Sequence, residues 1–151
     1  MTTRLSTGLR NAMAGDTGFA ATFDRGVIEI RSGTQPASAD NAVSGVLLGL
    51  VTLSSGAFTP GSSTNGLTWG SPSGGTVAKS GTWSFVGIAN GVAGWYRLRG
   101  NAADDGLLST TLPRMDGSVA AAGGDLQLST TTINIGAPVT IDSFTFTIPA
   151  N

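Results

Sequence analysis

The sequence predicts a mainly β protein, a β-sandwich of the jelly-roll type preceded by one or two short N-terminal helices. From residue 26 onward, short apolar or alternating stretches are separated by turn residues, and 23 glycines among 151 residues supply such turns. Before residue 26 the apolar spacing is helical instead. Roughly eight short strands favour a sandwich, for which an immunoglobulin-like arrangement is the nearest alternative. We therefore expect an N-terminal helical arm over residues 1–25 and a β-sandwich domain over residues 26–151.

The first predicted helix is indicated by apolar residues that recur every four positions and so share one helical face. These residues are Leu5, Leu9 and Met13. Thr2 or Thr3 can cap the start of this helix, and Gly15 can end it in a left-handed conformation.

A second short helix is predicted just before Gly26. Asp16 or Thr17 can cap its start. Phe19 and Phe23 lie four residues apart, so we expect their rings to pair on one face of this helix.

The first strands of the sandwich follow directly. Val27–Arg31 alternates, with Ile28 and Ile30 on one face of a strand. After the polar loop Ser32–Asn41, the segment Val46–Leu53 is apolar on both faces, which predicts a covered central strand.

The segment Ser54–Gly75 is rich in Gly, Ser, Thr and Pro, and only Leu67 and Trp69 offer apolar anchors. Such a composition is typical of loops. We expect a long loop that contains one short strand.

Two later strands change side-chain parity along their length. The strand at residues 83–88 changes after Phe85, so we expect a bulge or a strand end there. The strand at residues 139–148 changes at Asp142–Ser143, where a bulge is predicted. Further short strands, each bounded by turn residues, are predicted at Gly94–Arg99, Ser118–Ala122, Leu126–Leu128 and Thr132–Ile135.

The composition disfavours an enzyme. The chain has no histidine and no cysteine, Lys79 is its only lysine, and Glu29 is its only glutamate. These residue types supply most catalytic bases, nucleophiles and many metal ligands, and a serine nucleophile would lack its usual histidine or lysine base. We expect no catalytic residues, no metal and no cofactor.

The low charge of the chain bears on its partners. The net charge is −1 and only 11% of residues are charged, against about 25% in a typical protein. No basic patch indicates a nucleic-acid partner, no apolar run is long enough for a membrane span, and the N-terminus lacks a signal-peptide pattern. A surface with few charges costs little to desolvate when a partner covers it, although such a surface can also simply be tolerated.

Two Asp–Gly pairs are candidate cation sites. Asp104 and Asp105 precede Gly106, and carboxylates on a tight loop can bind calcium. The spacing of a calcium-binding loop is absent, and Asp–Gly is a common turn pair, so we favour a turn. The same prediction holds for Asp116–Gly117.

The segment Trp95–Arg99 is the strongest candidate for a contact surface. Alternation places Tyr96 and Leu98 on one face of a strand and Trp95, Arg97 and Arg99 on the other. If the first pair faces the core, an exposed tryptophan between arginines results, and these residue types are common at interface hot spots. In the alternative, Trp95 packs beneath the N-terminal helices and the arginines pair with Asp104 or Asp105.

Two segments carry a resemblance to a known class of proteins. Thr3–Gly15 (TRLSTGLRNAMAG) and Gly26–Ala39 (GVIEIRSGTQPASA) resemble the N-terminal part of small proteins encoded among the structural genes of tailed bacteriophages. Asp125–Pro149 is similar to them in style, with a Thr-rich stretch and an apolar final strand. Small jelly-roll cement proteins that decorate phage capsids are similar in size and fold class. The resemblance implies a virion component and transfers no catalytic motif.

The leading hypothesis is therefore a phage capsid decoration protein, present in the virion after assembly in the bacterial cytoplasm. Its expected partners are the major capsid protein and copies of itself, as a dimer or trimer. The expected partner-binding residues, on the N-terminal helical face and on the strand face, are Leu5, Leu9, Met13, Trp95, Arg97 and Arg99.

Two other hypotheses remain open. In one, the protein is a tail, baseplate or fibre-associated module whose loop Ser54–Gly75, with Trp69, binds a host receptor or glycan. In the other it is a small secreted or toxin-like β protein, which the absence of a signal peptide and of cysteines disfavours.

Overall fold

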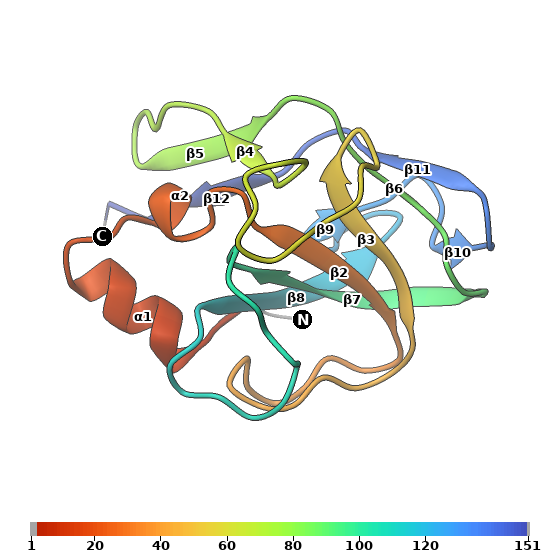
Figure 1. Ribbon diagram of the computed structural model, residues 1–151, viewed down its shortest axis with the longest axis horizontal. Helices are drawn as coiled ribbons and strands as arrows, with labels where there is room; N and C mark the ends of the chain where they lie inside the picture. Colours follow the sequence, from red (N-terminus) through yellow and green to blue (C-terminus); the bar gives the residue numbers. More distant parts are fainter. Residues whose placement is uncertain (1–2, 151) are drawn as a thin grey trace.

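The computed structural model describes residues 3–150 and has two sheets, with two short helices at one end (Figure 1). Within these residues, nine strands form the larger sheet, ordered β1-β8-β7-β2-β3-β6-β11 with β10 paired to β7 and β9 to β8. Three strands form the smaller sheet, ordered β12-β5-β4. The mainly β, sandwich-like class is thereby confirmed. The division into nine and three strands differs from the eight strands of a standard jelly roll.

The elements follow one another along the chain with short connections, apart from three long loops. The helices and strands are β1 (Arg4–Leu5), α1 (Thr7–Ala14), α2 (Phe19–Thr22), β2 (Val27–Ser32), β3 (Leu47–Leu53), β4 (Thr68–Trp69), β5 (Thr76–Ser80), β6 (Trp83–Val86), β7 (Gly91–Arg99), β8 (Arg114–Ala120), β9 (Leu126–Gln127), β10 (Thr132–Ile133), β11 (Pro138–Ile141) and β12 (Thr145–Thr147).

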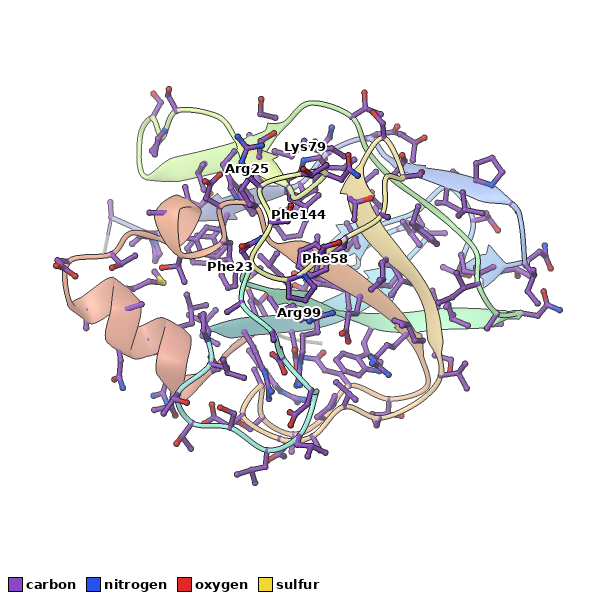
Figure 2. The ribbon with its side chains drawn as sticks, in the orientation of Figure 1. Phe23, Arg25, Phe58, Lys79, Arg99 and Phe144 are labelled. Carbon is purple, nitrogen blue, oxygen red and sulfur yellow. The ribbon has the colours of Figure 1, made fainter. Side chains whose placement is uncertain are left out.

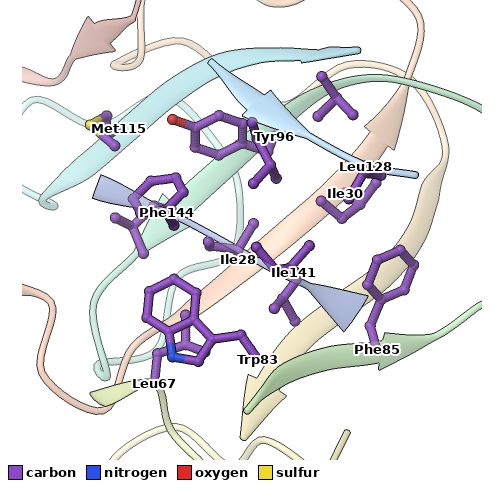
Figure 3. Close-up of a cluster of buried hydrophobic side chains, with 14 of the residues drawn as sticks. Ile28, Ile30, Leu67, Trp83, Phe85, Tyr96, Met115, Leu128, Ile141 and Phe144 are labelled. Carbon is purple, nitrogen blue, oxygen red and sulfur yellow. The ribbon is translucent and has the colours of Figure 1, made fainter. Parts of the chain in front are cut away.

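The core lies on one face of the central strands β2 and β7. Ile28 stands opposite Leu98, and Ile30 stands opposite Tyr96, and all four side chains are buried. Side chains from β6 and from the C-terminal strands complete the cluster, as Figure 3 shows for Trp83, Phe85, Ile141 and Phe144. The alternation at β2 and at Tyr96–Leu98 is confirmed.

The predictions for the middle of the chain are also confirmed. Strand β3 lies between β2 and β6 and is mostly buried, as expected for Val46–Leu53, except that Val46 precedes the strand and is exposed. The loop Ser54–Gly75 contains one short strand, β4. Its Trp69 anchors the loop, because the indole Nε1 donates to the Phe23 carbonyl oxygen at 3.1 Å and the ring meets Trp83 edge-on.

The two parity changes have different causes. Strand β6 ends at Val86, so the change after Phe85 marks a strand end. The bulge predicted at Asp142–Ser143 is wrong, because β11 ends in the larger sheet and β12 begins in the smaller one, so these residues link two sheets. The register shifts that do occur lie in β2, around Arg31, where the sequence gives no sign of them.

Residues 3–25 pack against the strands of the sandwich. Strand β1 pairs with β8, and Leu9, Phe19 and Phe23 belong to the same buried cluster as the strands. The rings of Phe19 and Phe23 pair edge-on with centroids 5.0 Å apart, as predicted.

The predicted helix ends need correction. Ser6, not Thr3, caps α1, and its hydroxyl accepts from the Leu9 N–H at 3.1 Å, because residues 4–5 are already paired in the sheet. Thr2 lies outside the described residues. Gly15 ends α1 with φ −86°, so no left-handed stop forms there. The N-cap residue of α2 is Gly18, and neither Asp16 nor Thr17 occupies that position.

Gly8 should be essential for the packing of α1. A Cβ at this position would lie 2.3 Å from the Thr111 carbonyl oxygen and 2.6 Å from that of Leu112. Alanine favours helices by about 1 kcal/mol over glycine, but overpacking against backbone costs roughly 1–3 kcal/mol. We expect Gly8→Ala to lower the free energy of unfolding, measured in urea. Gly18→Ala is the control, since nothing lies within 4 Å of its Cβ. Gly8→Ala as stable as Gly18→Ala would contradict the packing.

Candidate functional site

Most of the charged residues of this chain are buried or half-buried. The sequence has eight basic and nine acidic residues, all within the described part of the chain. The six of these side chains that are exposed are Arg10, Asp16, Asp24, Asp105, Asp125 and Asp142. Most of the others form one layer between strands β2, β7 and β8 and the two loops of residues 33–46 and 100–113, which lie together beside the sheet (Figure 1).

The centre of this layer is an ion pair between adjacent strands. Arg97 on β7 stands opposite Asp116 on β8 and opposite Glu29 on β2. Its Nε and Nη2 donate to the two carboxylate oxygens of Asp116, each at 2.7 Å, and both side chains are fully buried. Two parallel N–H···O bonds of this kind are the strongest geometry available to an arginine.

A second pair of the same kind ties a loop to the sheet. Arg114 on β8 donates from Nε and Nη2 to the Asp104 carboxylate at 2.7 and 2.6 Å. Arg99 stands opposite Arg114, and its Nε lies 3.0 Å from Glu29 Oε1 in an ion pair. Its guanidinium also lies 5.5 Å from the ring centroid of Phe58 (Figure 2). The two arginines are thus each balanced by a separate carboxylate.

The same arginines hold the backbone of the loop at residues 33–46. Arg97 Nη1 donates to the Asn41 carbonyl oxygen at 3.1 Å, and Arg114 Nη1 donates to that of Asp40 at 3.4 Å. The Asp40 carboxylate accepts from the Thr7 N–H at 2.7 Å and from its hydroxyl at 2.6 Å. The layer therefore connects helix α1, the sheet and both loops.

The environment of each carboxyl sets its pKa. For Asp104, burial raises the pKa, but the hydrogen bonds from Arg114 and the Gly106 N–H lower it by more, so it lies below its ordinary value. The pKa of Asp40 is lowered in the same way, with Thr7 as the donor. For Asp116, burial raises the pKa by more than Arg97 lowers it. Burial also raises the pKa of the Tyr96 phenol, with the charges of Asp125 and Asp116 adding to it.

The expected exposure of Trp95 and Arg97 is wrong, although alternation places them on the predicted face. Both are fully buried and Arg99 is half-buried, because the two loops cover this face of the sheet. The guanidinium of Arg97 lies 5.6 Å from the Trp95 ring centroid. The alternative prediction, in which Trp95 packs inward, agrees better with the structure. Its ion pairs differ, because Arg97 pairs with Asp116 and Arg99 pairs with Glu29, and neither pairs with Asp104 or Asp105.

The expected helical contact face also points inward. Leu9 is fully buried, and Leu5 and Met13 pack against the core. Of the six residues that the sequence suggested for partner binding, three are therefore buried and three are half-buried in this structure.

The two Asp–Gly pairs adopt different backbone structures. Asp104 to Gly106 form the predicted turn, in which Asp104 Oδ1 accepts from the Gly106 N–H at 2.8 Å and Gly106 has φ +76°. The turn predicted at Asp116–Gly117 is wrong, because both residues lie inside β8. Gly117 is needed there, since a Cβ would meet the Tyr96 ring at 2.6 Å. Among residues 3–150, no three His, Cys, Asp or Glu side chains lie close enough to hold a metal ion.

Sequence reasoning missed an exposed apolar surface at the end of the molecule opposite the helices, where β10 and β11 lie in Figure 1. We call this surface the apolar end and define it by Val46 (54% exposed), Val86 (42%), Ile88 (56%), Val92 (61%) and Ile135 (65%). Its only sequence signal is a lack of charge, since residues 41–78, 80–96 and 126–141 contain no charged residue.

Among the hollows elsewhere on the described surface, one is apolar and one is polar. An apolar groove of about 360 Å³ between α2 and the smaller sheet is lined by Phe19, Val77, Phe146 and Ile148, among others. A polar cleft of about 350 Å³ is lined by residues that include Asp125, Gln127, Asp142 and Thr145. Among the described residues, no helix is long and apolar enough to cross a membrane.

Comparisons with protein-family profiles, with curated protein sequences and with solved structures find no match to this chain. The function is therefore inferred from the chain's own residues and surfaces.

The ion pair of Arg97 and Asp116 can be tested directly. Asp116→Ala leaves a buried guanidinium without its counter-charge, which costs about 3–5 kcal/mol. We expect this loss in the free energy of urea unfolding. The double variant Arg97→Met/Asp116→Leu removes both charges and should recover most of it. Equal stability of Asp116→Ala and the unmodified protein would rule out a structural role for the pair.

Acid should weaken the attachment of the loop at residues 33–46. Because the folded pKa of Asp40 is lowered, its contribution to stability is present above the unfolded value of 3.8 and is lost as the pH falls through the folded value. We expect the melting temperature to fall between about pH 5 and pH 3, and to fall less in Asp40→Asn. Parallel pH profiles of the two proteins would contradict this assignment.

Proposed function

We propose that this protein is a non-enzymatic virion component of a bacteriophage, a decoration or cement protein that binds the outside of the head lattice and stabilises it. The observation that supports this proposal best is the low charge of the surface, since only six of the 17 charged side chains are exposed. A surface made mainly of uncharged side chains can be covered by another protein without the cost of burying unpaired charges.

The proposed mechanism is additive. Each copy contributes buried area across the joints between major capsid protein subunits, and the lattice presents many equivalent sites. Multivalent attachment then converts modest affinity per contact into a stable assembly. The location would be the virion, and the principal partner the major capsid protein.

The state of the ionisable groups supports a role without catalysis. Asp104 and Asp116 are held in ion pairs with arginines, and Glu29 lies between Arg31 and Arg99. The sole lysine, Lys79, donates to the Gly81 carbonyl oxygen at 2.8 Å. These groups stabilise the fold and are not gathered around a common reaction site.

A tail, baseplate or fibre module that binds a host glycan is the second candidate. The polar cleft at Asp125, Gln127 and Asp142 favours it, because such side chains can hydrogen-bond sugar hydroxyls. Trp69 does not support it as first expected, since its indole is held within the fold by the Phe23 carbonyl oxygen.

Copy number separates the two candidates. Quantitative mass spectrometry of purified virions should find on the order of hundreds of copies, as coverage of a lattice by multivalent contacts requires. A few copies to a few dozen would favour the tail or fibre module, and absence from the particle would exclude both.

Attachment to the capsid should depend little on salt. Raising NaCl from about 0.1 M to about 1 M shortens the electrostatic screening length from about 10 Å to about 3 Å. Because few charges are exposed, we expect the dissociation constant of the purified protein from stripped particles to change less than about threefold. A loss of tenfold or more would show that charge drives attachment.

A further inference from the structure

We infer that the apolar end is the interface of a symmetric dimer, and that the partner it fits is a second copy of this chain. This inference does not depend on the virion role. It follows from where the exposed apolar side chains gather, from the lack of charged residues in the segments that carry them, and from the hydrogen bonds that hold the neighbouring loops in place.

The apolar side chains are concentrated here beyond what scattered exposure would give. Among the described residues, five of the eight exposed large hydrophobic side chains belong to the apolar end. The other three, Leu107, Leu108 and Ile148, lie on the loop at residues 100–113 and beyond β12. Single exposed apolar residues are normal, but a contiguous group commonly marks an interaction site.

The five apolar side chains supply about half of the area that each partner of a stable pair buries. Five side chains exposed by 42–65% make a patch on the order of 400 Å². A stable pair buries about 800 Å² on each partner. The remainder can come from exposed, uncharged residues on the neighbouring loops and on strands β10 and β11: Asn90, Thr132, Asn134 and Thr140.

Charge selects the second copy as the occupant. The segments that build the apolar end fall within residues 41–78, 80–96 and 126–141, which carry no charged residue. Arg31 Nη1 donates to the Gly45 carbonyl oxygen beside Val46 at 3.4 Å, but the charge of Arg31 is already paired with Glu29 at 2.8 Å. A charged partner would therefore find no unpaired counter-ion here and would lose hydration on binding. The same end of another copy brings no charge to bury and no like-charge repulsion, and a two-fold axis makes the surface complementary to itself.

The loops of the apolar end are already held in place. The Gly87 N–H donates to the Ala137 carbonyl oxygen at 3.0 Å, and the Gly136 N–H donates to that of Gly87 at 2.8 Å. The Ile135 N–H donates to Asn90 Oδ1 at 2.9 Å. Because this surface is preorganised, little conformational entropy is lost when a partner covers it.

Sedimentation analysis of the full chain tests the inference. We expect the unmodified protein to form a dimer of the 15.1 kDa chain in the micromolar range, and Ile135→Glu to raise the dimer dissociation constant at least about 100-fold, because it places like charges face to face. The matched control is Leu108→Glu, which adds the same charge at a side chain that is 71% exposed outside the apolar end. This variant should dimerise as the unmodified protein does.

Three outcomes would overturn the inference. The first is an unmodified protein that stays monomeric up to about 0.5 mM, well above the micromolar range expected for the dimer. The second is a dimer unaffected by Ile135→Glu, and the third is a dimer that Leu108→Glu weakens as much as Ile135→Glu does. Circular dichroism checks folding, and Val92→Glu replaces Ile135→Glu if the latter does not fold.

Discussion

The bidentate ion pairs of Arg97 with Asp116 and of Arg114 with Asp104 hold two loops on the second face of the central strands. One face of the central strands has the usual apolar core, but the other is covered by two loops with little apolar material. Burying a charge is costly unless it is paired and hydrogen-bonded, and here the geometry of each pair meets that condition. The guanidinium groups also bind loop carbonyl oxygens, so the same side chains neutralise the carboxylates and fix the loops.

This use of charge has a consequence for the surface. In this chain only 11% of residues are charged and most of these are buried or half-buried, so most of the exterior consists of Ser, Thr, Gly, Asn and apolar side chains. Such an exterior lowers the desolvation cost of being covered by protein. The apolar end and the proposed attachment to a lattice both rest on this distribution, although each can fail without the other.

Local patterns in the sequence were enough to predict much of the fold. Alternation placed Ile28, Ile30, Tyr96 and Leu98 on the core face, and the apolar run before residue 54 predicted the central strand β3. Alternation assigns side chains to faces but does not say whether the second face is open or covered. Trp95 and Arg97 are buried because two loops cover the second face. Those loops are positioned by contacts between residues far apart in the sequence, such as Thr7 with Asp40.

The candidate site was less predictable for the same reason. Asp116–Gly117 has the composition of a turn, yet it continues a strand because Arg97 and the Tyr96 ring lie next to it in space. The uncharged stretches that form the apolar end are visible in the sequence, but their convergence at one end follows only from the strand order.

The central claim is that buried charges clamp the two loops onto the sheet, and amide hydrogen exchange tests it most directly. The Val43 N–H donates to the Gly106 carbonyl oxygen and the Ser109 N–H to that of Asp40, both at 2.9 Å, within loops that lack strands and helices. These two amides should exchange nearly as slowly as amides of β2 and β7. Exchange as fast as that of Ser62, whose loop hydrogen bond has no ion pair behind it, would contradict the account.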